Sequence, residues 1–322
     1  MMRMLLCLLA GVGIVAAEAP SAGQWPERMV KIVVPYGPGG GVDAFTRPIA
    51  ARLAEQTGQQ FLVENRAGAG GTIGVQAAAR SAADGYTFLS GGVHQPMAES
   101  LYPARGYDMD RDFVPVAITA VVPNVLVVTP KLPVGDVTEL IARAKANPEK
   151  LTYCSSGNGT SQHIIAELFK MAANVSILHV PHRGTAAAMI TLLGGQCDMM
   201  FDGMGTSASQ IGAGKLRGLA VTTAKRSALF PEIPTLQEAG GPTMDVGTWY
   251  GLWAPAGTPK EVVDRMHHEV ARALSVPAVK EVWKAQGAEL SPLPLGELRA
   301  YVRAEIARWT KINQQAGIKL DY

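Results

Sequence analysis

The fold is decided by the stretch KIVVPYGPGGGVD, which occupies residues 31–43. Its first residues form a β-branched run, and the rest is a glycine-rich turn that leads into residues 43–55. There Phe45, Ile49 and Leu53 recur every four residues, which is the spacing of one helix face. Glycines let a backbone approach a ligand closely, and a helix start offers unpaired N–H groups and a positive dipole end. The stretch therefore predicts a strand, an anion-binding loop and a helix.

The same strand-then-helix order repeats along the chain. Further strands are predicted at 60–64, 85–89, 150–153, 177–180 and 199–201. Further helices are predicted to end at 81 and to span 160–171 and 185–193. This alternation predicts parallel sheets flanked by helices, and two such units in succession favour two lobes over one long sheet.

Two extended segments, 121–130 and 248–255, are predicted to connect the lobes. The tail after Pro259 has a helical pattern, and we expect it to pack back on the first lobe. Lobe 1 is then discontinuous, and the expected division is 24–122 and 252–322 for lobe 1 and 123–251 for lobe 2. Two chain crossings make a hinge and a cleft, where small-molecule sites preferentially form.

Composition narrows the range of functions. The 322 residues carry 29 Lys and Arg against 27 Asp and Glu, which gives a net charge of +2. So weak a field gives no support to a nucleic-acid groove or a polybasic membrane patch. The three cysteines are too few for a disulfide scaffold and lack the paired spacing of a zinc site. We expect a soluble protein that binds no nucleic acid.

The N-terminus has the parts of a secretory signal peptide. Arg3 belongs to a short basic start, an apolar run reaches residue 17, and small residues follow. Cleavage of residues 1–17, after Ala17, is preferred to cleavage after Ala19, because Pro20 disfavours the second position. A buried first helix is the alternative, but the cap-free, basic-then-apolar layout favours a signal peptide. We therefore expect a periplasmic protein.

A second polar loop, CSSGNGTSQH, occupies residues 154–163 between a predicted strand and a helix. Its hydroxyl and amide side chains can donate to a carboxylate without the cost of a buried charge. Thr160 or Ser161 is expected to cap the helix. Cys154 and His163 could form a nucleophile–base pair. However, no third orienting group and no G-x-S-x-G turn accompany them, so no catalytic residue is predicted.

Three other residues each allow two interpretations. Asp43 either caps the first helix, with Arg47 one turn on as an ion-pair partner, or touches the ligand. Arg183, at a strand-to-helix turn, either meets a ligand carboxylate or is solvated. Asp202, at a strand end, either accepts from the ligand or caps the turn that follows.

Cofactor and metal sites are not predicted. Residues 39–44 match the loose G-x-G-x-x-A dinucleotide pattern after a strand, so a dinucleotide-dependent enzyme is an alternative. Export, however, separates the protein from nicotinamide cofactors. His179 and His182 lack a carboxylate companion at helical spacing, which argues against a metal site.

The motifs quoted above, together with others in the same order, are similar to those of one family. The others are VENRAGAGG at 63–71, DGYT at 84–87, LGGQCDMMFD at 193–202, PEIPT at 231–235 and WAPAGTP at 253–259. They resemble the Bug (TctC-like) receptors, the extracytoplasmic solute-binding proteins of tripartite tricarboxylate transporters. The resemblance covers nearly the whole mature chain. It implies an α/β Venus-flytrap fold with a mainly parallel sheet in each lobe. It also implies a receptor that captures a small organic carboxylate without catalysis and delivers it to membrane permease subunits. We expect the protein to be a monomer.

The resemblance further implies where the ligand lies. The loops matching 36–43 and 155–161 act as two jaws on the carboxylate, and the position matching Asp202 contacts its far end. The expected ligand-binding residues are Tyr36, Gly40, Gly41, Val42, Asp43, His94, Ser156, Asn158, Thr160, Ser161, His163, Arg183, Gly184 and Asp202. Where the family usually has Pro-Tyr-Lys-Gly, this chain has PHRG at 181–184, which leaves the identity of the carboxylate open. A receptor that signals to a sensor partner fits the same motifs.

The cysteines of the mature chain, Cys154 and Cys197, are expected to be free, buried thiols. Cys154 is expected to close a strand at 151–154 and Cys197 to open a strand at 197–201, and these strands are parallel neighbours in a doubly wound sheet of order 2-1-3. Cys154 then lies about three residues beyond the level of Cys197, which puts their Cα atoms roughly 11 Å apart. A disulfide needs less than about 7 Å.

Overall fold

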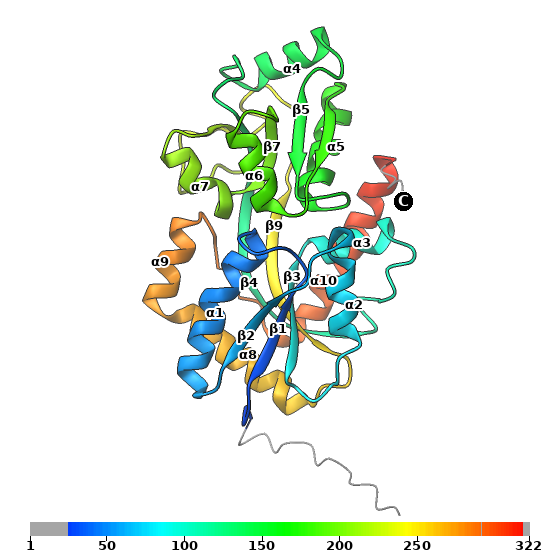
Figure 1. The fold of residues 1–322 in the computed structure, drawn as a ribbon, viewed down its shortest axis with the longest axis vertical. Coiled ribbons are helices and arrows are strands. Elements are labelled where there is room, and N and C mark those ends of the chain that lie inside the picture. Colours follow the sequence, from blue (N-terminus) through cyan, green and yellow to red (C-terminus); the bar gives the residue numbers. More distant parts are fainter. Residues whose placement is uncertain (1–24, 291, 318–322) are drawn as a thin grey trace, which may run out of the picture.

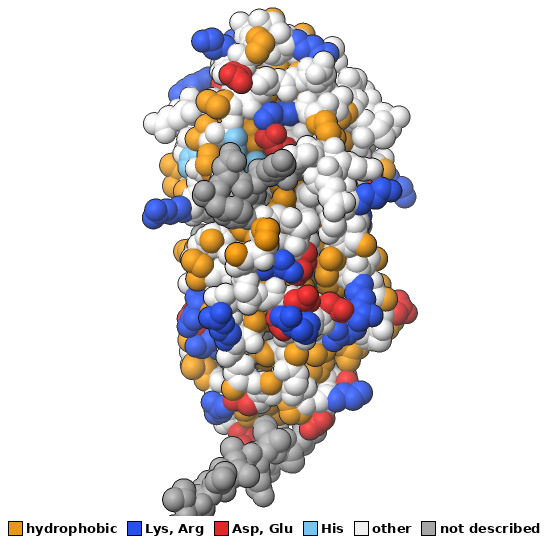
Figure 2. Space-filling model, turned by 90° about the vertical axis from the view of Figure 1, so that its right-hand side faces the viewer, with side chains coloured by type: hydrophobic (Ala, Val, Ile, Leu, Met, Phe, Trp, Pro, Cys, Tyr) orange, Lys and Arg blue, Asp and Glu red, His pale blue; other side chains and the backbone are white. Residues whose placement is uncertain are grey.

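The computed structural model describes residues 25–290 and 292–317, which form two α/β lobes arranged along the long axis of the molecule (Figure 1). The predicted signal peptide at 1–17 lies outside these residues. Within the described ranges, no helix is both long enough and apolar enough to cross a membrane. Figure 2 shows basic and acidic side chains beside one another over the lower lobe, in keeping with the small net charge.

Lobe 1, the lower lobe in Figure 1, is built on a sheet with the order β2-β1-β3-β9-β4. Its strands are β1 (Val30–Val34), β2 (Phe61–Asn65), β3 (Thr87–Gly92), β9 (Gly247–Pro255) and the first part of β4 (Phe113–Val128). The strands β1, β2 and β3 are parallel, whereas β9 runs antiparallel to both β3 and β4.

Helices cover both faces of this sheet because side chains along β1 alternate between the faces. Ile32 and Val34 belong to the same core cluster as residues of α1 (Gly41–Thr57), α8 (Lys260–Ser275) and α9 (Pro277–Ala285). Val33 belongs to the cluster that contains residues of α2 (Thr72–Ala79), α3 (His94–Leu101) and α10 (Leu295–Gln315). The helical tail of the chain therefore packs on lobe 1.

Lobe 2 holds three parallel strands in the order β6-β5-β7. These are β5 (Thr152–Ser155), β6 (Leu178–Pro181) and β7 (Met199–Gly203), and a further strand is β8 (Arg217–Val221). Both β7 and β8 pair antiparallel with the second part of β4. The helices of this lobe are α4 (Val137–Ala146), α5 (Ser161–Ala173), α6 (Thr185–Leu193) and α7 (Met204–Gly212). The predicted α/β fold is confirmed. Of the two crossing strands, β9 runs antiparallel to the three-stranded parallel group of lobe 1, and β4 runs antiparallel to that of lobe 2.

The strand β4 joins the lobes because it changes partners along its length. Phe113 to Pro123 pairs with β9 in lobe 1, and Asn124 to Val128 pairs with β7 in lobe 2. The return crossing leads into β9, which pairs with β4 from its first residue, Gly247. Figure 1 shows β4 and β9 running side by side between the lobes.

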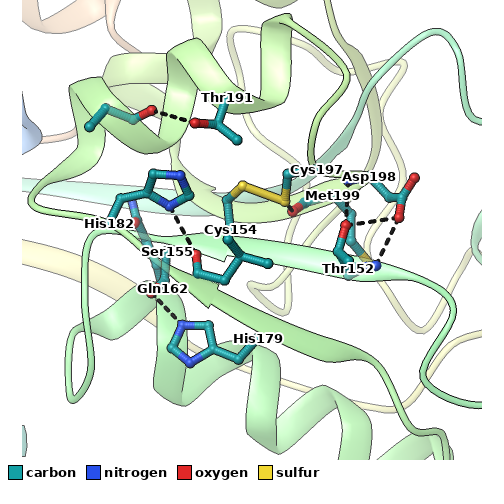
Figure 3. Close-up of a disulfide and its surroundings, with 12 residues drawn as sticks. Thr152, Cys154, Ser155, Gln162, His179, His182, Thr191, Cys197, Asp198 and Met199 are labelled. Carbon is teal, nitrogen blue, oxygen red and sulfur yellow. Dashed lines mark hydrogen bonds between the residues drawn. A yellow bond between two sulfur atoms is a disulfide. The ribbon is translucent and has the colours of Figure 1, made fainter.

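The prediction of two free thiols is wrong, because Cys154 and Cys197 form a disulfide with a Cα–Cα distance of 6.1 Å (Figure 3). The predicted strand order is nevertheless present, and Tyr153 lies opposite Met199. The error arose from treating Cys197 as part of a straight strand.

Cys197 lies in the turn between α6 and β7, since β7 begins only at Met199. The turn is anchored at Asp198, whose carboxylate accepts from the backbone N–H and the hydroxyl of Thr152. Cys197 shares a core cluster with Cys154 and with Leu192 near the end of α6. The chain thus comes down from the helix onto the sheet at Cys197, and its side chain reaches Cys154 across the sheet face.

Candidate functional site

The first turns of five helices meet at one small cavity between the lobes. Gly41 and Val42 begin α1, His94 begins α3, Ser161 and Gln162 begin α5, and Thr185 begins α6, while Gly203 precedes α7; all of them line it. The cavity has a volume of about 30 Å³, which holds a water molecule or the oxygen end of a carboxylate. Neither Lys nor Arg lines it among the described residues. The partial positive charges that face it are those of helix N-termini.

On the lobe 1 side, the loop after β1 brings backbone rather than side chains to the cavity. Helical geometry leaves the N–H groups of Gly41 and Val42 without an intrahelical acceptor. Glycine at position 41 lets the backbone approach Tyr250, because a Cβ atom there would lie 2.1 Å from the Tyr250 hydroxyl oxygen and would force that side chain to shift. The aromatic ring of Tyr36 and the hydroxyl of Tyr250 complete this wall.

Asp43 is buried and holds the loop together instead of lining the cavity. Its carboxylate accepts from the Gly39 N–H at 3.0 Å, from Arg47 at 2.8 and 2.9 Å and from Asn65 at 3.0 Å. Burial raises the pKa of Asp43, but these hydrogen bonds outweigh it and hold the pKa below its ordinary value. The predicted ion pair with Arg47 is present, whereas the N-cap position belongs to Gly40.

On the lobe 2 side, Ser156 and Ser161 bring hydroxyl groups to the cavity. Gln162 ties this wall together. Its amide oxygen accepts from the Ser156 N–H at 2.6 Å, and its amide nitrogen donates to Asp202 at 2.7 Å. Thr160 is the N-cap residue of α5, and its buried hydroxyl donates to the carbonyl of Gly157 at 2.7 Å, away from the cavity.

Among the described residues, Asp202 is the sole carboxylate that lines the cavity. It lies in β7, next to the strand's last residue, and accepts from Gln162, from Thr206 and from Ser207. Burial raises its pKa above the ordinary value, although these hydrogen bonds oppose the shift. Asp202 therefore fixes the start of α7, as one interpretation held, and it also lines the cavity, where contact with a ligand stays a prediction.

The two lobes touch across the cleft. The Ser161 N–H donates to Nδ1 of His94 at 3.3 Å, and the hydroxyl of Tyr102 donates to the carbonyl of Asn158 at 2.6 Å. Burial lowers the pKa of His94 to about 4, so its imidazole is neutral and can accept at neutral pH. These contacts show the cleft in a closed arrangement.

Two larger cavities continue outward from the small one. A cavity of about 510 Å³ shares Tyr36 and Ser156 with it. A further cavity of about 700 Å³ shares Gly157, His182 and Arg183 with the second. The three form a series from the helix ends to the rim of the cleft.

The outer two cavities have a distinct charge. Arg105 and Arg183 line them, whereas no Asp or Glu of the described residues does. Arg105 is paired with Glu99. Arg183 forms no ion pair with any described residue and is exposed. The rim of the cleft therefore offers one uncompensated cation.

The structure thus brings most of the predicted residues to the cleft. Those at the inner cavity are Tyr36, Gly40, Gly41, Val42, His94, Ser156, Ser161 and Asp202. Those at the outer cavities are Asn158, Arg183 and Gly184. Those that line none of the three cavities are Asp43, Thr160 and His163.

Some cavity residues were not predicted. At the inner cavity they are Gln162, Thr185, Gly203, Thr206, Thr248 and Tyr250. Gln162 stands inside the polar loop motif, and its place near a helix start was a usable signal. Thr248 and Tyr250 reach the cavity because β9 pairs antiparallel with β3 and β4. No local sequence pattern predicts this pairing. No group of three His, Cys, Asp or Glu side chains in the described part of the chain is placed to hold a metal ion.

Comparison with known proteins agrees with this architecture. The family described as "Tripartite tricarboxylate transporter family receptor" matches residues 45–318. The chain is 37% identical to the protein BugT of Bordetella pertussis over 320 residues, which cover 97% of this chain and 98% of BugT.

Two solved structures are similar over most of their length. One is an R. palustris protein with adipate, with 40% identity, a TM-score of 0.88 and coverage of 92% of this chain and 99% of that one. The other is MatC of Rhodopseudomonas palustris with bound malate, with 33% identity, a TM-score of 0.85 and coverage of 89% and 99%. The resemblance drawn from the motifs is confirmed, and the chain belongs to the tripartite tricarboxylate transporter receptor (TctC) family of periplasmic solute-binding receptors.

Proposed function

We propose that this protein captures a small organic carboxylate between its lobes and presents it to the membrane permease subunits of a tripartite tricarboxylate-type transporter. Residues 1–17 would direct its export and be removed after Ala17. The observation that carries the proposal is the convergence of five helix starts on a cavity that no Lys or Arg of residues 25–290 and 292–317 lines. Helix N-termini stabilise anions through their free N–H groups and their dipoles.

In this proposal the carboxylate binds between the two jaws. The N–H groups of Gly41 and Val42 would donate from lobe 1, and the hydroxyls of Ser156 and Ser161 from lobe 2. His94 would add a donor, because its Nδ1 accepts from Ser161 and a neutral ring then carries its proton on Nε2. Asp202 would accept from a hydroxyl group or water at the ligand.

The cavity sizes favour an elongated ligand. A space of about 30 Å³ accommodates little more than the carboxylate end, so the remainder extends into the cavity of about 510 Å³. The ligands named for two relatives, adipate and malate, each carry a second carboxylate. Arg183, the uncompensated cation of the outer cavities, is placed to meet such a group.

Arg183→Gln is therefore expected to weaken binding of a six-carbon dicarboxylate and to spare the matched monocarboxylate. The loss of one partly exposed ion pair corresponds to roughly a fivefold rise in Kd for adipate. Hexanoate has the same carbon chain without the second charge, so its Kd should not change. Calorimetric titration of the wild type and of Arg183→Gln with both ligands gives the comparison. An unchanged Kd for adipate, or equal weakening of adipate and hexanoate, would contradict a contact between Arg183 and the second carboxylate.

A thermal-shift screen tests the proposed function itself. A ligand that binds only the folded state adds about 2.7 kcal/mol of stability at a hundred times its Kd. At least one member of a panel of mono-, di- and tricarboxylates should therefore raise the Tm of the mature protein by several degrees. A panel without any such member would contradict carboxylate capture.

A further inference from the structure

Two stacked imidazole rings lie under the loop that forms the lobe 2 jaw. His163 of α5 and His179 of β6 have their ring centroids 4.3 Å apart and their planes within 10°. The ring of Tyr153 continues the stack, with its centroid 4.6 Å from that of His179. None of these three side chains lines the cavities described above, so the proposed function assigns them no contact with the ligand.

Each imidazole is connected to a backbone N–H of the loop. Nδ1 of His163 accepts directly from the Gly159 N–H at 3.1 Å. Nε2 of His179 shares a hydrogen bond of 2.6 Å with the hydroxyl of Ser155, and that hydroxyl oxygen accepts from the Gly157 N–H at 3.1 Å. Figure 3 shows Ser155 in β5 and His179 in β6, with the His179 ring on the opposite side of the strands from the disulfide.

The opposite side of the same loop faces lobe 1. The carbonyl of Asn158 accepts from Tyr102, and a Cβ atom on Gly159 would lie 2.6 Å from the Tyr102 ring. Gly159 has a φ of +71°, a conformation that favours glycine. The loop is therefore held between imidazoles on one side and Tyr102 on the other, so a small displacement at Gly159 changes the contact between the lobes.

We propose that His163 and His179 are positioning residues. They hold the loop 155–161 in the position from which its hydroxyls and the lobe 1 jaw, residues 36–43, contact the same ligand. The identity of that ligand rests on the proposed function, whereas the support of the loop does not. His163 is the sharper case, because it accepts from a backbone N–H and must be unprotonated at Nδ1 to do so.

The surroundings keep His163 in that state. Burial lowers its pKa, the carboxylate of Glu167 opposes the shift, and the ammonium group of Lys170 adds to it. The neighbouring His179 and Tyr153 meet it with ring faces. The result is a neutral acceptor at neutral pH.

The test uses two substitutions of nearly equal shape. His163→Asn places an amide oxygen where Nδ1 stood, and His163→Leu has a similar volume but no acceptor. Both remove the stack on His179 equally, so their difference reports the hydrogen bond to Gly159. His268→Asn, at an exposed position of α8, is the matched control.

The deciding readout is amide hydrogen exchange in the ligand-free protein, for a peptide that covers 156–161. His163→Leu should speed exchange there about tenfold or more, while His163→Asn and His268→Asn should stay near the wild type. Unchanged exchange in His163→Leu, or equal acceleration in His163→Asn, would overturn the proposal.

A smaller change keeps the proposal testable if His163→Leu does not fold. Ser155→Ala removes the hydroxyl between His179 and the Gly157 N–H. Faster exchange of the same peptide is expected, and unchanged exchange would overturn the proposal.

The effect of the loop position on ligand binding is measured with adipate. The expected rise in Kd for adipate is tenfold or more for His163→Leu and less than threefold for His163→Asn. Failure of the wild type to bind adipate would concern the proposed ligand and leave the exchange result to decide the support of the loop.

Discussion

Removal of the Cys154–Cys197 disulfide is expected to lower the free energy of unfolding by about 4 kcal/mol. The bridge closes a loop between residues 43 positions apart, and loop-closure entropy for that length gives about this value. For a chain of this size the Tm should fall on the order of 10 °C. The effect should be mainly on stability, since both cysteines are buried in the core between β5 and α6.

The measurement is denaturant unfolding of the mature protein with and without reductant. The Cys154→Ala/Cys197→Ala double variant is the control, because reductant should not change its unfolding curve. Thiol titration of the unfolded, unreduced protein should find no reactive group in the mature chain. Two reactive thiols, with no effect of reductant on the midpoint, would show that the bridge does not form.

Acidification from pH 6.5 to pH 4 is expected to destabilise the fold through its buried histidines. The pKa of His94 is lowered to about 4 by burial, so between these pH values the unfolded chain binds a proton that the folded chain does not. The free energy of unfolding therefore decreases as the pH is lowered. The decrease is at most about 1.4 kcal/mol per pH unit for one group, or about 3 kcal/mol between pH 6.5 and pH 4. The contribution is fully present above pH 6.5.

Other buried groups add to or oppose this trend. Burial lowers the pKa of His179 to about 3 and also lowers that of His163, so both act in the same direction as His94. Burial raises the pKa of Asp202, and this shift opposes the loss of stability on acidification. The stabilising contribution of Asp202 is present at low pH and is lost as the pH rises. A variant is therefore needed to isolate His94.

His94→Asn supplies an amide oxygen to the Ser161 N–H and cannot be protonated in this range. Denaturant unfolding of the wild type and the variant between pH 4 and 7.5 gives the difference in slope. Between pH 6.5 and pH 4, the free energy of unfolding of the wild type should fall by about 3 kcal/mol more than that of the variant, which corresponds to the uptake of one proton. Parallel curves would show that His94 titrates normally in the folded protein.

The sequence predicted the lobes and most of the jaws because those features are local. The glycine-rich turn after β1 places Gly41 and Val42 at a helix start, and the polar run after β5 does the same for Ser161. Both are short-range consequences of a strand followed by a helix. The family resemblance added the order in which such units occur.

The errors and omissions came from contacts between distant segments. Cys197 meets Cys154 because the turn after α6 descends onto the sheet face, which a straight strand does not anticipate. Tyr250 enters the cavity through antiparallel pairing of β9. His163 belongs to the predicted loop motif but turns beneath the loop to support it. A motif therefore identifies the residues near a site, but it does not tell which of their side chains face the ligand and which support the loop from behind.

The central claim is that the cleft holds a carboxylate through its charge, and one calorimetric comparison tests it. The mature protein is titrated with the carboxylate that gives the largest thermal shift and with its primary amide. Two charge-assisted hydrogen bonds contribute about 3 kcal/mol or more, so the amide should bind at least a hundredfold more weakly than the carboxylate. Equal affinity for the two would contradict anion recognition by the converging helix ends.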